Sequence, residues 1–252
     1  MITEADAYNA FDISGTSAVE FLSWIAVGCG LSGEIRVLDV GCGTGRLLPA
    51  LRQLGWLPLG LEPHTPYFEE AARIAATSAG IEVRQGGFDD IRESNAFEVV
   101  AAINGPFQYL LNSSVRTDAL QRMFCALVPG GVMVLDMANF PHILTNYSPP
   151  APQTVVFGDG HLTRSVEHTI DLREARFVHR DRFELVDRAG SSKTLETTHT
   201  FGIVGFPEVA SLARAAGFVD VKTYRSLKSR SEERLDGARI VLSARKPGSQ
   251  TA

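Results

Sequence analysis

The residues best suited to chemistry lie in a short glycine-rich stretch near the start of the chain. Gly41, Gly43 and Gly45 stand at alternate positions, and Asp39 comes two residues before the first of them. Glycines at this spacing let the backbone pass close beneath a ligand that side chains would block. A G-x-G-x-x-G dinucleotide fingerprint would need glycine where the chain has Arg46. The pattern therefore favours a ligand that carries an ammonium and a sulfonium, which tolerates Asp39, over a pyrophosphate.

The elements that must position this stretch alternate between strand and helix. Short β-branched or aliphatic runs give way to longer helical patterns throughout the first half of the chain. This alternation predicts right-handed βαβ units and a parallel sheet covered on both faces. The expected strands are residues 35–39, 58–62, 83–84, 99–103 and 132–137, and the expected helices between them are 47–54, 67–79 and 115–127.

The proline-rich segment 147–153 marks a boundary, because it continues neither a helix nor a central strand. Beyond it, residues 154–157, 161–171, 176–187 and 194–201 read as an antiparallel meander, followed by a helix from Phe206 to Gly217 and two closing strands, 219–224 and 238–244. We predict one domain over residues 1–252, with a core of 33–146 and 203–246 and an inserted antiparallel flap at 151–202.

The segment Val37–Arg46 resembles motif I of class I S-adenosylmethionine (SAM)-dependent methyltransferases of the small-molecule type. The resemblance implies SAM as the cofactor and an α/β, Rossmann-like seven-stranded methyltransferase sheet with helices on both faces. It also implies that Asp39, Gly41, Cys42, Gly43 and Gly45 bind the methionine end of SAM. The flap resembles the antiparallel lid of small-molecule members such as glycine, sarcosine and amino-sugar N-methyltransferases.

The same resemblance implies two further parts of the cofactor site, one for the ribose and one for the adenine. Glu62 and Pro63 end the second strand, where a carboxylate can accept both ribose hydroxyl protons. At the third strand end the family's usual Asp is Gly87 in this chain. Phe88 would then offer its backbone amide and a stacking ring, and Asp89 or Asp90 would accept the adenine amino group, with Asp89 as the named candidate.

The loop after the fourth strand should lie beside the transferable methyl group, because ligands bind outside the carboxyl ends of such strands. We name Asn104 and Tyr109 as candidate catalytic residues, and Asn104 also as a cofactor contact. Asn104, Gln108 and Tyr109 can orient a substrate but none is a strong base. The loop therefore favours an amine acceptor over an oxygen acceptor, which stays as the alternative. The segment also superficially resembles the Asn-Pro-Pro-Tyr box of DNA amino-methyltransferases, but an inserted glycine weakens that comparison.

Aromatic and imidazole side chains outside the core add further candidates. Tyr8 matches the first position of the Tyr-Asp-x-x-Tyr segment that closes over the cofactor in small-molecule N-methyltransferases, while the second tyrosine is Phe11. An amphipathic helix covering the sheet explains this segment equally well. His168, His179 and His199 lie on expected flap strands, where side chains alternate between the two faces. We interpret them as solvated or hydrogen-bonded bystanders, and a general base that points into the acceptor pocket stays as the alternative for one of them. No His, Asp and Glu cluster has ligand spacing, so no metal is expected.

Composition narrows the function classes further. The net charge of −5 and the scattered Lys and Arg give no footprint for nucleic acid. The acidic start and the lack of a long apolar run predict a cytoplasmic protein without membrane attachment, and the three unclustered cysteines predict neither disulfides nor zinc. We expect a small-molecule methyl acceptor as the partner, and the flap's edge strands would also permit a homodimer. A nicotinamide oxidoreductase and a non-catalytic SAM-binding module stay as rival interpretations.

Overall fold

The computed structural model describes residues 2–11 and 15–248, which build two sheets. The larger sheet has seven strands in the order β10-β11-β5-β4-β1-β2-β3, with β11 antiparallel to both of its neighbours and the other pairings parallel. Its strands are β1 (Arg36–Val40), β2 (Leu57–Glu62), β3 (Glu82–Gln85), β4 (Phe97–Ala102), β5 (Leu127–Ala138), β10 (Val219–Tyr224) and β11 (Arg239–Arg245). The predicted Rossmann-like sheet is confirmed.

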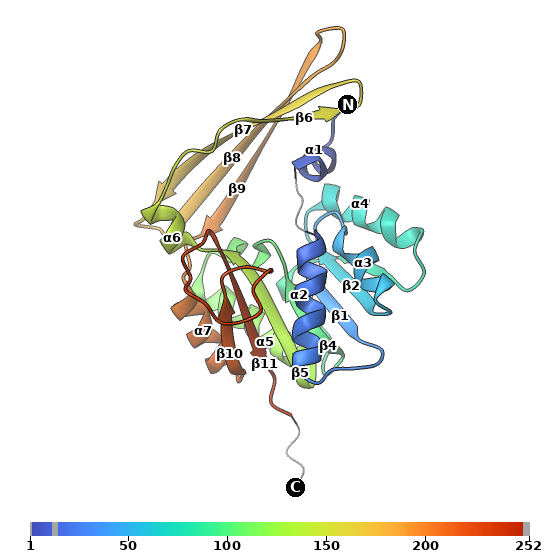
Figure 1. Cartoon of the computed structure of the whole chain (residues 1–252), viewed down its shortest axis with the longest axis vertical. Helices are drawn as coiled ribbons and strands as arrows, with labels where there is room; N and C mark the ends of the chain where they lie inside the picture. The colour runs from blue at the N-terminus through green and yellow to red at the C-terminus, as the bar shows by residue number, and fades with distance from the viewer. Residues whose placement is uncertain (1, 12–14, 249–252) are drawn as a thin grey trace.

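Helices cover both faces of this sheet (Figure 1). One apolar cluster joins the central strands to α2 and α3, and another joins them to α5 and α7. The helices are α1 (Glu4–Phe11), α2 (Gly15–Gly28), α3 (Leu47–Gln53), α4 (Thr65–Ala76), α5 (Ser113–Ala126), α6 (Phe140–Thr145) and α7 (Phe206–Ala215), with single 3₁₀ turns η1 (Phe88–Asp90) and η2 (Pro106–Tyr109). Helices α2 and α6 were not predicted from the sequence.

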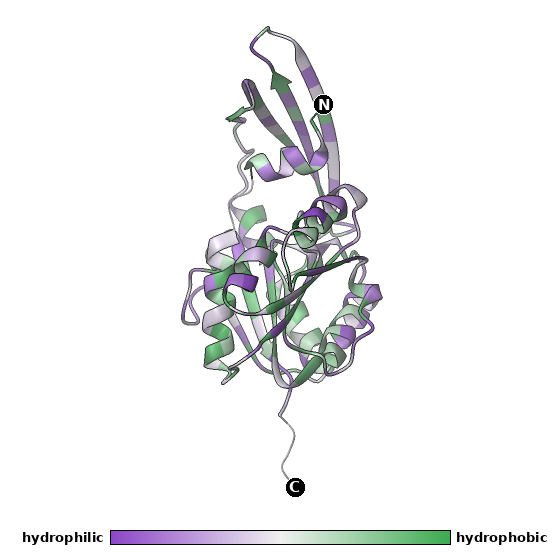
Figure 2. Cartoon of the chain, turned by 90° about the vertical axis from the view of Figure 1, so that its right-hand side faces the viewer, coloured by the Kyte–Doolittle hydropathy of each residue, from purple (hydrophilic) through white to green (hydrophobic). Residues whose placement is uncertain are grey.

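The smaller sheet is the predicted antiparallel flap, and it is confirmed. It contains β6 (Gln153–Phe157), β7 (Gly160–Asp171), β8 (Arg176–Val186) and β9 (Ser192–Gly202), paired in chain order. Figure 1 shows the flap projecting beyond the α/β body, with α1 between the two. Apolar and polar residues alternate along its strands in Figure 2, as expected for a sheet with one covered and one open face.

The topology fixes where a ligand can sit. Strand β1 pairs with β2 on one side and with β4 on the other, so the chain leaves the β1–β4 boundary in opposite directions. Ligands of open α/β sheets bind outside the carboxyl ends of the strands at such a switch point. The glycine-rich turn after β1 and the loop after β4 both lie there.

Candidate functional site

The glycine-rich turn after β1 is locked against two neighbouring segments. The backbone N–H groups of Gly41 and Cys42 both donate to the Leu61 carbonyl oxygen, at 2.7 and 3.0 Å. Gly41 has φ +75°, and a Cβ at that position would lie 2.4 Å from the Cβ of Pro106. Only glycine therefore fits at position 41. On its remaining side, Gly43 faces the ring of Tyr8.

Glu62 is preorganised beside this turn. Its side chain is buried, its Oε2 accepts a hydrogen bond from the Gly43 N–H at 2.8 Å, and its Oε1 accepts one from the His64 N–H at 2.9 Å. Burial raises the pKa of Glu62, while these two backbone hydrogen bonds act in the opposite direction. A carboxylate has about four acceptor positions, so it retains capacity for hydroxyl donors of a ligand.

Asp39 is the most unusual group of the site. Its residue is 2% exposed, and within the described residues its Oδ1 has no hydrogen-bond partner. Burial, and to a smaller extent the negative charge of Glu62, raises the pKa of Asp39 to about 7. A buried carboxylate without a partner is costly unless something satisfies it. A ligand that brings a positive charge to the turn fits this requirement.

The Cys42 side chain points toward β2. A Cβ added at Gly60 on β2 would lie 2.6 Å from the Cys42 Sγ, so the thiol fills the space that this glycine leaves. Burial raises the pKa of the thiol. The predicted role of Cys42 thus has no support from its side chain, and its backbone N–H is already used.

At the end of β3, Gly87 stands where the family usually carries an acidic residue, and the carboxylate of Asp89 lies close to this position. A Cβ built on Gly87 would lie 3.4 Å from Asp89 Oδ1 and 3.9 Å from Pro63 Cβ. The structure therefore brings the predicted residues Pro63 and Asp89 to the same point. The Phe88 ring is buried in the core, 5.9 Å from the Phe107 ring centroid. The prediction that this ring stacks on a ligand is wrong, because the ring completes the core beneath η1.

Helix α1 lies across the glycine-rich turn. Tyr8 approaches to 3.7 Å from where a Gly43 Cβ would stand, and its hydroxyl accepts a hydrogen bond from Asn104 Nδ2 at 3.3 Å. The next residue, Asn9, accepts a hydrogen bond from Thr44 Oγ1 at 2.6 Å. Tyr8 thus contacts both the turn after β1 and the loop after β4, as its predicted closing role requires.

The loop after β4 is held from beneath. Asn104 has φ +70°, and its N–H donates to Asp136 Oδ2 at 3.0 Å, while Arg239 pairs with the same carboxylate. Gln108 is buried and bonds to the backbone of Ala138 in both directions, at 2.8 and 2.9 Å. Gln108 therefore does not face a substrate, contrary to the expected orienting role, and it fixes η2 onto β5.

Tyr109, at the end of η2, is 48% exposed and meets the flap. Its hydroxyl oxygen lies 2.9 Å from His199 Nδ1, and its ring centroid lies 4.7 Å from that of Phe201. From the sequence alone, we interpret the flap histidines as bystanders. The structure instead places one of them against a candidate catalytic residue. No motif signals this contact, since the two residues are 90 positions apart.

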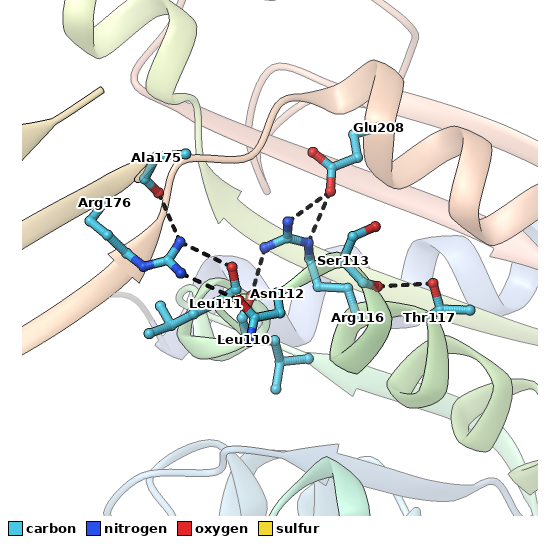
Figure 3. A network of polar contacts seen from close by, with 9 residues as sticks. All are labelled: Leu110, Leu111, Asn112, Ser113, Arg116, Thr117, Ala175, Arg176 and Glu208. Carbon is cyan, nitrogen blue, oxygen red and sulfur yellow. Dashed lines mark hydrogen bonds and ion pairs between the residues drawn. The ribbon is translucent and has the colours of Figure 1, made fainter. Parts of the chain in front are cut away.

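Two arginines tie the segment after Tyr109 to the flap and to α7 (Figure 3). Arg116 on α5 is buried, donates to the Leu110 carbonyl at 2.7 Å and pairs with Glu208 at 2.8 Å. Arg176 on β8 donates to the Leu111 carbonyl at 3.1 Å. These contacts set the position of the loop after β4 relative to the flap.

Over residues 2–11 and 15–248, no group of three or more His, Cys, Asp and Glu side chains is arranged to hold a metal ion. In the same part of the chain, no helix has the length and apolar character to cross a membrane.

Comparison with known proteins identifies the part of the chain that carries this site. The family described as "Methyltransferase domain" matches residues 37–131, from the glycine-rich turn through β4 and α5 into β5. Residues 37–131 form a methyltransferase domain. The segment Val37–Arg46, which resembles motif I of class I SAM-dependent methyltransferases, lies within this match.

Curated relatives also align with only part of this chain and with only part of their own length. The ubiquinone biosynthesis O-methyltransferase of Bradyrhizobium diazoefficiens is 30% identical over 109 residues, 42% of this chain and 41% of the relative. The cypemycin N-terminal methyltransferase of a Streptomyces species is 25% identical over 139 residues, 54% of this chain and 55% of the relative. The alignments thus span about half or less of these curated relatives.

Solved structures match the whole fold, flap included. The sugar N-methyltransferase KedS8 from Streptoalloteichus sp. ATCC 53650 superposes with a TM-score of 0.79 at 16% identity, covering 98% of this chain and 93% of that one. SAM-bound CalS10, an amino pentose methyltransferase from Micromonospora echinaspora, gives a TM-score of 0.77 at 20% identity, with 97% and 98% coverage. At these identities the likeness is one of fold.

Proposed function

We propose that this protein transfers the methyl group of SAM to a nitrogen of a small-molecule amine. The observation that carries the proposal is the buried Asp39 carboxylate with its unpartnered Oδ1, directly before a glycine turn in which Gly41 and Gly45 have no room for a Cβ. A cationic amino acid end of a ligand satisfies that carboxylate. Pyrophosphate would add negative charge beside it, which argues against a nicotinamide cofactor.

The residues around the turn fit the rest of SAM. Gly43 leaves room for the methionine end, while Gly41 and Gly45 let the turn pack closely against Pro106 and Ala71. Glu62 offers its remaining acceptor positions to the ribose hydroxyls. Asp89 provides an acceptor for the adenine amino group. When bound, SAM supplies an electrophilic methyl group on a sulfonium leaving group, so the chain's own task is to place the acceptor in line and to exclude water.

Tyr8, Asn104 and Tyr109 surround the place where the acceptor must enter. Partial desolvation of the half-exposed phenol, and to a smaller extent nearby phenolic and acidic groups, raises the pKa of Tyr109, so its phenol keeps its proton at neutral pH. A protonated phenol orients a substrate but does not remove a proton from it. An amine that attacks in its neutral form needs only such orientation. The sugar N-methyltransferase and the amino pentose methyltransferase among the structural neighbours support the same acceptor class.

One observation favours O-methylation as a second candidate function. His199 Nδ1 lies 2.9 Å from the Tyr109 hydroxyl, and burial lowers the pKa of His199, so a neutral imidazole stands near the acceptor side. Such a base serves a phenol acceptor. The O-methyltransferase from Bradyrhizobium supports this second candidate.

Methyl transfer to a defined acceptor panel tests the proposal. The purified chain is incubated with methyl-labelled SAM and with benzylamine, ethanolamine, D-glucosamine, phenol or catechol, and labelled product is identified by mass spectrometry. Transfer to amines supports the proposal, and transfer to phenols alone supports O-methylation. SAM binding without transfer to any acceptor would contradict it and favour a non-catalytic SAM-binding module.

A further inference from the structure

Three histidines of the flap form one row across three strands. The strand register places His168 on β7 directly opposite His179 on β8, and His179 directly opposite His199 on β9. Side chains at opposed positions lie on the same face of a sheet. Phe183 shares this face of β8 and packs in an apolar cluster with Ala7 of α1. The histidine row therefore lies on the face that is turned toward α1 and the candidate site.

Two of these histidines are committed to a network within the flap. His179 Nε2 lies 2.9 Å from Asp181 Oδ2, and His179 Nδ1 lies 2.9 Å from His168 Nε2. The Tyr147 hydroxyl lies 3.2 Å from His168 Nδ1, and Arg164 donates to the other oxygen of Asp181 at 2.6 Å. One set of roles satisfies these three contacts: Tyr147 donates to His168, His168 to His179, and His179 to the carboxylate. Arg164 Nη2, which can only donate, also lies 3.2 Å from His179 Nε2.

Two groups of this network, His168 and Asp181, have shifted pKa values. Burial, and next to it His179, lowers the pKa of His168. Burial alone would raise the pKa of Asp181, but the hydrogen bonds from His179 and Arg164 outweigh it and lower the pKa. Asp181 is therefore the negatively charged end of the network. Each ring nitrogen of His168 and His179 already has a partner within the network, so none is left for a substrate.

His199 differs from the other two, because its contact leaves the flap. Its Nδ1 lies 2.9 Å from the hydroxyl of Tyr109, which is half exposed on the loop after β4. Burial lowers the pKa of His199; Asp181, the next-largest influence, acts in the opposite direction, and His179 adds to the lowering. When the imidazole of His199 is neutral and the phenol of Tyr109 is protonated, the favoured hydrogen bond runs from the phenol O–H to the unprotonated Nδ1. This direction leaves the lone pairs of the phenol oxygen pointing away from His199.

We propose that His199 is a positioning residue, which keeps the Tyr109 oxygen as a hydrogen-bond acceptor for an N–H of the amine substrate. The inference rests on the proposed function. With its N–H held by Tyr109, the amine directs its lone pair toward the methyl carbon. The new nitrogen–carbon bond forms as the carbon–sulfur bond breaks with its electron pair on sulfur, and the proton stays on the product nitrogen until water removes it.

The same geometry predicts how acid stops the reaction. A protonated His199 donates from Nδ1, so the Tyr109 oxygen must accept this bond and turn its own proton outward to the amine lone pair. Attack is then blocked. The charged and titratable groups that act on His199 are His179 and Asp181 on β8, Glu4 on α1 and His64 after β2.

The direction of the hydrogen bond is measured without any substrate. Imidazole nitrogen NMR of the full chain, with His199→Asn for assignment, should show His199 at pH 7 as the neutral Nε2–H form with Nδ1 as acceptor. Tyr109→Phe should shift the Nδ1 resonance toward that of a free ring nitrogen. A His199 that is protonated at pH 7, or that carries its proton on Nδ1, would overturn the proposal.

A double-mutant cycle on the best amine of the panel (benzylamine, ethanolamine or D-glucosamine) measures the effect on catalysis. His199→Leu should lower kcat about tenfold, the scale of one lost hydrogen bond, and should add nothing in a Tyr109→Phe background. His199→Asn, whose Oδ1 replaces Nδ1 as acceptor, should keep most of the activity and lose the decline of kcat in acid. His161→Leu, on the exposed outer face of β7, is the matched control and should match the wild type.

Additive losses in the cycle, or an acid decline that persists in His199→Asn, would refute the positioning role. A wild type that methylates no amine of the panel contradicts the proposed function instead, while the NMR measurement still decides the hydrogen bond. The two failures are thus distinguishable.

Discussion

Replacing Asp39 by asparagine should stabilise the free protein and weaken SAM binding. The pKa of Asp39 is raised from the ordinary value of 3.8 to about 7 by burial and then by Glu62. At 1.36 kcal/mol per unit this corresponds to a destabilisation of about 4 kcal/mol once the carboxyl is ionised. The new amide costs about 1–3 kcal/mol, because it is buried without full partners. The net gain in the free energy of unfolding is then about 1–3 kcal/mol.

The sign of the pH dependence follows from the same pKa. A carboxyl whose pKa is raised by folding binds its proton more tightly in the folded state, so the fold loses stability as pH rises from about 4 to about 7. The loss is complete above pH 7. The advantage of Asp39→Asn should therefore be largest at pH 8 and should shrink toward pH 5.

Urea unfolding, followed by tryptophan fluorescence at pH 5 and pH 8, checks this prediction. Asp118→Asn, at an exposed position on α5, is the matched control and should leave stability unchanged at both pH values. SAM titrated into Asp39→Asn at pH 8 should bind at least about tenfold more weakly, a loss of about 1.4 kcal/mol. The reasoning would be refuted if Asp39→Asn were less stable than the wild type at pH 8. It would also be refuted if the difference in free energy of unfolding between variant and wild type were the same at pH 5 and pH 8.

Two further substitutions test the elements that hold the site. Gly41→Ala should lower the free energy of unfolding by about 2–4 kcal/mol in urea, because αL backbone costs about 1–2 kcal/mol and the new Cβ also meets Pro106. Gly55→Ala has a similar φ and open space, so it should show the backbone cost alone, and equal losses would exclude the clash. Arg116→Met should lower the midpoint of thermal unfolding by the equivalent of about 2 kcal/mol, since it frees the Leu110 carbonyl and Glu208. Arg182→Met, which loses only an exposed pair, should change it little, and the opposite ranking would contradict the account.

The sheet was predictable from the sequence because strand and helix alternate with clear periods. Strands such as β1 read as buried apolar runs, and glycine or proline bounds their connections. Helix α2 was not predicted, since Gly15–Gly28 is apolar with glycine at both ends and gives little amphipathic pattern. Its burial against the sheet, with Phe21 and Leu22 fully covered, decides its conformation instead.

The candidate site was predictable only where the chain's own spacing determines the geometry. Asp39 and Glu62 end adjacent parallel strands, so their proximity follows from the βαβ pattern. The contact of Tyr109 with His199 depends on the register of the flap, and a slip of one residue would move the histidine to the outer face. The approach of Asp89 to Gly87 depends in the same way on the local 3₁₀ turn η1.

Calorimetric titration of SAM tests the central claim most directly, with wild type, Glu62→Ala and the exposed outer-face control Glu184→Ala measured side by side. The account predicts micromolar binding to the wild type and to the control, and an affinity at least about tenfold lower for Glu62→Ala, a loss of about 1.4 kcal/mol. A folded, ligand-free wild type that does not bind SAM would contradict it.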